Sequence, residues 1–218
     1  MGRPNITLKI ASSLDGKIAL SNGQSEWITG EAAREHGRRL RGAHDAIAIG
    51  ANTALLDNPQ LTTRIDGLPD PIRLIFDTKA KLSLTSNLVK TAKDIPTYII
   101  TGRDSDAARH LAEQGVIILF SGVTEAGYVD IKTGLDLLTH HGIRTLLLEG
   151  GGTLAASFFK QDFIDVIEWY RAPIILGADG RSAIGELGLE NMNALHRFNR
   201  ISLTEIGADI HERYERIR

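Results

Sequence analysis

The stretch that most constrains the fold lies at residues 145–154, where an apolar run ends in a carboxylate and three glycines follow. Thr-Leu-Leu-Leu-Glu leads into Gly150, Gly151 and Gly152, and a helix-like segment starts at Thr153. This order predicts a buried strand, a tight turn and a helix N-terminus, with Glu149 at the end of the strand. Glycines adopt positive φ readily and let backbone N–H groups converge on an anion, and a helix N-terminus adds partial positive charge. The stretch therefore favours a phosphate or pyrophosphate site, although a plain turn between strand and helix fits it equally well.

Strands and helices alternate over the first two-thirds of the chain. The apolar patterns predict strands at residues 5–13, 46–49, 72–77, 97–100 and 116–120, and helices at 29–41, 105–114 and 133–141, with a loop at 50–64. An extended segment is expected at 164–172, and two late strands at 198–206 and 210–217, antiparallel to each other. The prediction is an α/β fold with a mostly parallel, doubly wound sheet and antiparallel C-terminal edge strands. A chain of 218 residues suits one domain, residues 1–218.

Composition excludes several classes of function. The formal net charge of −2 argues against broad nucleic-acid binding, and the absence of cysteine removes thiolate catalysis and Cys-based metal sites. No secretory leader and no apolar stretch long enough for a bilayer is present, so a cytoplasmic protein with no membrane partner is expected. The histidines and carboxylates form no metal-binding motif, so no metal is expected.

A few side chains have local contexts that suit chemistry. Lys17 directly follows an Asp-Gly turn, and a lysine next to Glu149 in a cleft can deliver a proton. Arg41 ends the first predicted helix and Arg64 closes the following loop, where a guanidinium suits a phosphate. Trp27 lies in a polar loop without apolar periodicity, where an aromatic ring can flank a planar ligand. Taken singly, each of these polar side chains fits ordinary solvent exposure as well.

Taken in order, these pieces resemble the reductase domain of bacterial riboflavin biosynthesis, a member of the dihydrofolate-reductase-like superfamily. The resemblance covers essentially the whole chain. Its matching blocks are Arg3-Pro4, residues 8–17, 25–29, 50–53 and 57–64, Pro71-Ile72-Arg73 with Asp77, residues 149–154 and residues 172–177, together with Arg41. Ser-Leu-Asp-Gly-Lys, Asp-Asn-Pro-x-Leu-Thr-x-Arg and Glu-Gly-Gly are specific in combination, though each is weak alone.

The resemblance implies an NADPH-dependent reduction of a phosphorylated pyrimidine, in which a phosphoribosylamino group becomes ribitylamino. It places Lys17 and Glu149 next to the ribose carbon that accepts hydride. The residues implied at the substrate are Ser25, Arg41, Leu61 and Arg64, with the arginines at its phosphate. The residues implied at the cofactor are Ala11, Trp27, Thr53, Asp57, Thr78 and the turn that begins with Gly151, Gly152, Thr153 and Leu154. The resemblance also suggests a homodimer.

One departure from the resemblance bears on the substrate. In many bacteria this reductase follows a zinc deaminase with H-x-E and P-C-x-x-C ligands, and neither motif occurs here, so a free-standing reductase is expected. An aminouracil and a diaminopyrimidinone are both possible substrates. Two alternatives stay open: an oxidoreductase of the same superfamily with another substrate, and a sensor that binds the nucleotide without oxidising it. Arg103 is a candidate for a 2′-phosphate, so the choice between NADPH and NADH stays open as well.

Overall fold

The computed structural model describes residues 2–217, and their contacts group into two compact units. Unit 1 comprises the residues up to Asn5 and Arg38–Leu147, and unit 2 comprises Ile6–Gly37 and Leu148–Arg218. Neither unit is one continuous piece of chain, and each is described by itself below. That residues 1–218 make one domain stays a prediction.

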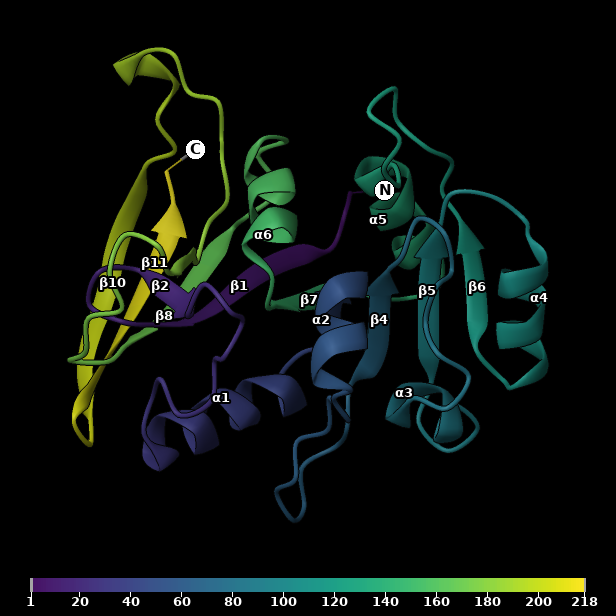
Figure 1. Cartoon of the computed structure of the whole chain (residues 1–218), viewed down its shortest axis with the longest axis horizontal. Helices are drawn as coiled ribbons and strands as arrows, with labels where there is room; N and C mark the ends of the chain where they lie inside the picture. Colours follow the sequence, from purple (N-terminus) through teal and green to yellow (C-terminus); the bar gives the residue numbers. More distant parts are fainter. Residues whose placement is uncertain (1, 218) are drawn as a thin grey trace. The chain divides into compact units, whose positions relative to one another are not determined.

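Unit 1 is built on four parallel strands in the order of the chain: β3 (Ala46–Gly50), β4 (Ile72–Phe76), β5 (Thr97–Thr101) and β6 (Ile117–Phe120). Figure 1 shows β4, β5 and β6 side by side with their arrows pointing the same way. The strands β3, β4 and β5 are almost entirely buried, as expected for parallel strands covered on both faces. The four strand predictions for this unit are confirmed to within two residues at each end.

The helices of unit 1 that follow β4, β5 and β6 begin at side-chain caps. They are α3 (Asn87–Lys90), α4 (Asp106–Glu113) and α5 (Ile131–His140). The side chains of Ser86, Ser105 and Asp130 each accept a hydrogen bond from a backbone N–H in the first turn. The predictions at 105–114 and 133–141 are confirmed, whereas the four-residue helix α3 was not predicted.

The segment at 50–64 corrects one prediction. It was expected to be a loop, but α2 (Ala51–Asp57) starts directly after β3 and occupies its first half. Gly50 is the N-cap and offers no side-chain acceptor, and Ala54 is the only buried residue of the helix. Two turns without a cap and with one buried position leave no amphipathic pattern that sequence can reveal.

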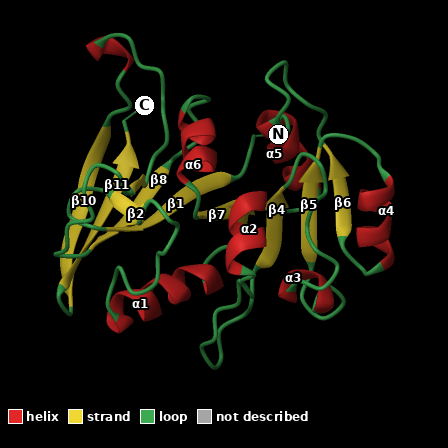
Figure 2. Cartoon of the chain, in the orientation of Figure 1, coloured by secondary structure: helices red, strands yellow, loops and turns green. Residues whose placement is uncertain are grey.

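Unit 2 contains most of β1 (Asn5–Ser12), which pairs in parallel with β8 (Val166–Arg171). The strand β11 (Asp209–Arg216) runs antiparallel to β8, and β10 (Phe198–Ile206) runs antiparallel to β11. Figure 2 shows this group in yellow, with β10 and β11 as long neighbouring strands. The predicted antiparallel strands at the C-terminal end are confirmed, and with them the mixed character of the α/β fold.

The remaining elements connect or extend these groups. The helix α1 (Glu31–Gly42) begins in unit 2 and ends in unit 1, and β7 (Thr145–Glu149) passes from unit 1 to unit 2. The helix α6 (Gly152–Phe159) follows β7, and a short 3₁₀ helix lies at Met192–Ala194. A separate two-stranded ribbon joins β2 (Lys17–Ala19) to β9 (Arg181–Ser182). No helix between residues 2 and 217 is long and apolar enough to cross a bilayer.

Candidate active site

The glycine turn after β7 has the geometry that its sequence predicts. Gly150 and Gly151 have φ of +75° and +78°, where a side chain is strained. Gly151 is the N-cap of α6 and contributes no side-chain acceptor to the first N–H groups of that helix. A Cβ on Gly152 would lie 2.4 Å from the carbonyl oxygen of Ser182, so only glycine fits there. Thr153 and Leu154 follow in the first turn, and the uncapped helix end suits an anionic ligand such as a pyrophosphate.

The turn that carries Lys17 is held by polar contacts. Ser13 Oγ bonds Asp15 Oδ1 at 2.6 Å and accepts the Lys17 N–H at 2.9 Å. Asp15 also accepts backbone N–H groups of Leu176 and Gly177, at 3.1 and 2.8 Å. The Ser13 hydroxyl, together with these two N–H groups, lowers the pKa of Asp15 to about 2. These hydrogen bonds hold the turn where it presents the lysine.

One segment contacts both turns, and we call residues 180–185 the β9 strap. Its Ser182 Oγ accepts a hydrogen bond from Lys17 Nζ at 3.1 Å, and Ala183 N donates to Gly16 O at 3.0 Å. At the other side Gly185 N donates to Gly152 O at 2.9 Å. The β9 strap thus holds the lysine turn and the glycine turn together in unit 2. The sequence showed only a Gly-rich stretch here, with no pattern that distinguishes it from an ordinary loop.

Glu149 ends β7, half-buried, directly before the glycine turn. Its charge is one of the causes that raise the pKa of Tyr170, after burial and Glu168. The proposed pairing of Glu149 with Lys17 stays a prediction.

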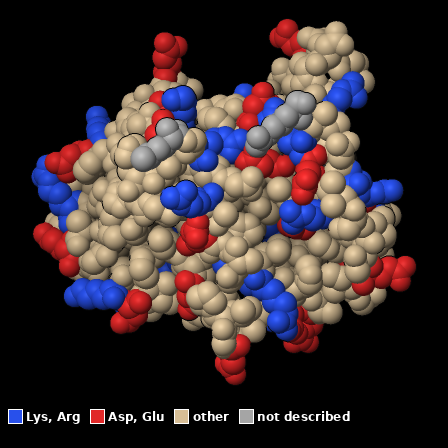
Figure 3. Space-filling view, turned by 180° about the vertical axis from the view of Figure 1, so that it is seen from behind, with Lys and Arg blue, Asp and Glu red and all other residues tan. Residues whose placement is uncertain are grey.

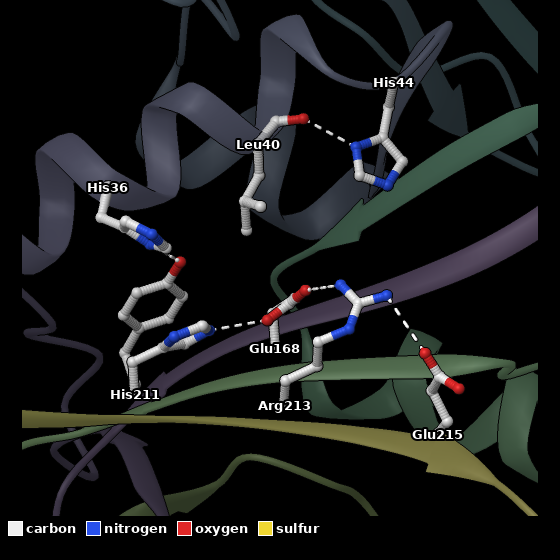
Figure 4. A network of polar contacts seen from close by, with 8 residues as sticks. His36, Leu40, His44, Glu168, His211, Arg213 and Glu215 are labelled. Carbon is white, nitrogen blue, oxygen red and sulfur yellow. Dashed lines mark hydrogen bonds and ion pairs between the residues drawn. The ribbon is translucent and has the colours of Figure 1, made fainter. Parts of the chain in front are cut away.

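A buried network lies beside this region in unit 2 (Figure 4). Glu168, which is 2% exposed, bonds His211 Nε2 at 2.6 Å and also accepts a hydrogen bond from Arg213. The ring of His211 stacks on Tyr170 at 4.6 Å, and the Tyr170 hydroxyl lies 2.7 Å from His36 Nδ1. The buried carboxylate of Glu168 is thus paired with His211 and Arg213. Through Tyr170 and His36 the network also joins β8 and β11 to α1.

Trp27 lies on the surface of the loop before α1. It is 74% exposed and has a φ of +67°. The guanidinium of Arg34 lies over its ring at 4.4 Å and donates to Thr29 O at 2.7 Å. Arg34 thus holds this loop through a cation–π contact and a hydrogen bond to its backbone. The neighbouring Ser25 is exposed, and Ala11 lies half-buried in β1.

In unit 1, Thr53 and Thr78, which the resemblance implies at the cofactor, follow neighbouring strands. Gly50 pairs with Phe76, so β3 and β4 end side by side. Thr53 lies in the helix that follows β3, and Thr78 lies two residues beyond the end of β4. Thr78 Oγ1 accepts the N–H of Val129 at 3.1 Å, which ties the next loop of the unit to this edge. The carboxyl ends of parallel strands are where ligands of such sheets bind. Asp57 ends α2, and burial raises its pKa.

The arginine-bearing segment of unit 1 has an unusual backbone. Leu61 and Arg64 have φ of +58° and +51°, in the left-handed region that favours glycine. Leu61 is 4% exposed and packs in the core, while Arg64 is exposed. Arg41 Nη1 donates to Thr62 O at 2.8 Å and so braces the segment between them. Strain of this kind is frequent where a backbone is shaped for a ligand.

Charge on the molecular surface is mixed. Figure 3 shows Lys and Arg interspersed with Asp and Glu over the face seen from behind, as expected for a chain with a net charge of −2. Within residues 2–217, no group of three His, Asp or Glu side chains is gathered to hold a metal ion.

Comparison with known proteins identifies the family. The model of the RibD C-terminal domain matches residues 4–211, so this chain belongs to that family. It is 37% identical over 213 residues to the riboflavin biosynthesis protein RibD of Bacillus amyloliquefaciens, covering 96% of this chain and 56% of that protein. The chain thus spans little more than half the length of that relative.

Solved structures share the fold. The diaminohydroxyphosphoribosylaminopyrimidine deaminase/5-amino-6-(5-phosphoribosylamino)uracil reductase of Thermotoga maritima superposes with a TM-score of 0.81 at 27% identity, covering 99% of this chain and 57% of that one. The riboflavin biosynthesis reductase Rib7 of Saccharomyces cerevisiae gives a TM-score of 0.77 at 20% identity, covering 99% and 90%. The expected α/β fold, with a mostly parallel sheet and antiparallel edge strands, is confirmed.

Proposed function

We propose that this protein is an NADPH-dependent reductase of riboflavin biosynthesis that converts a phosphoribosylamino-pyrimidine into its ribitylamino form. The observation that carries the proposal is the β9 strap, which joins the lysine turn and the glycine turn in one unit. Family membership supports the reaction class, and the region matched in the T. maritima protein belongs to a chain with both deaminase and reductase in its name. The aminouracil named there is one candidate substrate, and the diaminopyrimidinone is the other.

The cofactor proposal rests on the glycine turn and on the ends of β3 and β4. In unit 2, the uncapped N-terminus of α6, reached through Gly151 and Gly152, suits a pyrophosphate. In unit 1, Thr53, Asp57 and Thr78 lie at or after the carboxyl ends of β3 and β4 and are proposed as cofactor residues by themselves. The exposed ring of Trp27, with the Arg34 guanidinium over it, offers a flat surface for a ring of the cofactor, and the half-buried Ala11 of β1 is proposed as a further cofactor residue. When bound, the nicotinamide supplies the hydride.

The substrate proposal assigns its phosphate to Arg41 and Arg64. Guanidinium groups bind phosphate in a bidentate manner, and the left-handed backbone at Leu61 and Arg64 shapes the segment that presents them. Ser25, exposed in the loop before Trp27, would add a hydroxyl contact to the substrate.

Lys17 is proposed to handle the proton. The ribose ring opens to an imine, which keeps the nitrogen of the ribitylamino product, and hydride would be added to the imine carbon next to the lysine. The Lys17 ammonium donates a proton to the nitrogen that develops negative charge, Glu149 holds the lysine in place, and solvent returns the proton to the amine after turnover. Positioning supplies much of the remaining rate enhancement.

Two other functions would use the same architecture. An oxidoreductase of this superfamily with a different substrate would keep the cofactor residues and bind neither pyrimidine. A sensor would bind NADPH without oxidising it.

The decisive experiment follows absorbance of NADPH and of NADH with each candidate pyrimidine in turn. Oxidation of NADPH with one pyrimidine is expected, and Lys17→Ala is expected to lower kcat by about a hundredfold or more while the Kd for NADPH changes little. Oxidation with neither pyrimidine favours the other oxidoreductase, and tight NADPH binding without oxidation by any substrate favours the sensor. Full turnover in Lys17→Ala would refute the role of the lysine.

We also propose a homodimer in the cytoplasm. Support for the dimer comes from β10, the outer strand of its group in unit 2, where Ile201 and Leu203 are 53% and 50% exposed. Half-exposed aliphatic side chains on such a strand suit contact with a second copy.

A further inference from the structure

We propose that Ser182 is a positioning residue for Lys17, which fixes the ammonium in place without neutralising it. The inference rests on the proposed function, in which Lys17 transfers the proton. No part of the sequence resemblance assigns a role to Ser182 or to the β9 strap.

Lys17 and Ser182 contact each other directly. Lys17 and Ser182 are paired residues of β2 and β9, so their side chains lie on the same face of the ribbon. The Lys17 Nζ donates to Ser182 Oγ at 3.1 Å, and a Cβ on Gly180 would lie 3.0 Å from Lys17 Cγ. The lysine stem therefore runs along the backbone of the β9 strap to the serine hydroxyl.

The side chain of Lys17 needs a contact at its tip to hold one position. A lysine side chain has four flexible carbons, and its unrestrained rotamers carry about 2 kcal/mol of entropy. Lys17 is only half-buried, so packing alone does not fix its tip. A hydrogen bond at the end of the chain restricts the ammonium to one region.

The partner of Lys17 is a neutral hydroxyl and not a carboxylate. A serine hydroxyl is neutral and accepts one of the three N–H bonds of the ammonium, which leaves the positive charge and two donors for a ligand. A carboxylate in the same place would pair with the charge and compete with the substrate.

The backbone of Ser182 is packed against the glycine turn. Its carbonyl oxygen lies against Gly152, so close that a Cβ there would be 2.4 Å away. The neighbouring Gly185 N donates to Gly152 O at 2.9 Å. Ser182 therefore contacts the lysine through its side chain and the glycine turn through its backbone. These two contacts fix the position of the ammonium relative to the N-terminus of α6.

The test compares Ser182→Thr with Ser182→Val. The two side chains have nearly the same shape, both suit a strand, and only threonine keeps the hydroxyl. Ser182 is exposed, so the ribbon has room for the extra methyl group. We expect kcat of Ser182→Thr to stay within about threefold of the parent and kcat of Ser182→Val to fall by about tenfold or more. The KM for NADPH is expected to change little in either variant, since the serine acts through the lysine.

A second measurement needs neither cofactor nor substrate. Lysine amines are labelled with an acylating reagent, and Lys17 is followed by peptide mass spectrometry relative to the exposed Lys160 of the same chain. The hydrogen bond holds the tip of Lys17 against Ser182 and restricts its approach to the reagent, so Lys17 is expected to react faster in Ser182→Val than in Ser182→Thr. Ser182→Ala serves as a second hydroxyl-free variant if the melting temperature of Ser182→Val shows that it folds poorly.

The outcomes separate the inference from the proposed function. Equal kcat in the threonine and valine variants overturns the inference, and so does a slow valine variant whose Lys17 labels at the threonine rate. Full turnover in Lys17→Ala overturns the proton role of the lysine instead, and the labelling rates then still report whether Ser182 holds it.

Discussion

At the scale of single residues, the lysine turn combines contacts that sequence can reveal with contacts that it cannot. Ser13, Asp15 and Lys17 are close in the chain, and the Asp-Gly signal correctly predicted their turn. Ser182 lies 165 residues from Lys17, and no local pattern connects them. Lys17 was thus a reasonable candidate from sequence, while the residue that holds it was not.

The pKa of Asp15 should depend on Ser13. The hydroxyl of Ser13 is the largest cause that lowers this pKa to about 2 from 3.8. In Ser13→Ala we expect the Asp15 pKa to rise towards 3.8, measured by ¹³C NMR of the carboxyl group. Asp104, whose pKa is lowered by Arg109, is the internal control and should not move. An unchanged Asp15 would mean that the backbone N–H groups alone set its pKa.

The same shift predicts a dependence of stability on pH. Because the pKa of Asp15 in the folded protein lies below its unfolded value of 3.8, its contribution to folding is fully present above pH 3.8. It is lost as the pH falls from 3.8 to about 2. Urea unfolding of Asp15→Asn across this window should show a weaker loss of stability with acid than the parent. Parallel curves would contradict the prediction.

Arg73 illustrates a residue whose role is structural. It is 1% exposed, burial lowers its pKa to about 10, and its guanidinium donates to six acceptors of unit 1. The acceptors are Gln60 O, Leu88 O, Thr91 O, Thr91 Oγ1, Ile95 O and Thr97 Oγ1. Its place in the Pro-Ile-Arg block did not show whether it serves a ligand or the core.

We expect Arg73→Met to lower the free energy of unfolding by about 3 kcal/mol or more, because buried carbonyls lose their donors. Denaturant unfolding measures the change. Arg103→Met, at an exposed arginine, is the matched control and should stay within about 0.5 kcal/mol. Equal effects of the two substitutions would show that the network of Arg73 contributes nothing.

At the scale of elements, strong patterns were predictable and weak ones were not. Strands with continuous apolar runs, such as β3 and β4, and the longer helices with a Ser or Asp cap, α4 and α5, were found from sequence alone, whereas the four-residue α3 was missed despite its Ser86 cap. The helix α2 and the ribbon strand β9 were missed, because each is short and has almost no buried apolar side chain. The helix α2 contains Thr53 and Asp57, and β9 pairs with the strand that carries Lys17. The elements that sequence missed therefore lie at the proposed functional residues.

Two glycines in helices should respond differently to alanine. At Gly152 a Cβ meets the Ser182 carbonyl at 2.4 Å, and this backbone atom cannot move without shifting the β9 strap. At Gly37 in α1 the nearest atom is Lys9 Cε at 3.2 Å, near the end of a flexible side chain. Gly152→Ala should lower the melting temperature by several degrees, whereas Gly37→Ala should hold or raise it, since alanine favours a helix by about 1 kcal/mol over glycine. Comparable melting temperatures for the two would refute the close approach at Gly152.

At the scale of the whole molecule, the proposed dimer has a direct test. One chain has a mass of 23.8 kDa, so light scattering coupled to gel filtration should give twice this value. Ile201→Lys together with Leu203→Lys places charge on β10 and should shift the mass towards that of one chain. A parent protein that already elutes with the mass of one chain would dispose of the homodimer.

Unit 2 is built from two pieces of chain that are far apart in the sequence, and this affects how the protein is synthesised. Lys17 leaves the ribosome early, but Ser182 and Gly185 are made more than 160 positions later. A nascent chain therefore contains Lys17 long before the residues that hold it. Premature termination ahead of residue 176 would yield a product that lacks both the N–H groups that bind Asp15 and the serine that holds the ammonium, however well its first strands had formed.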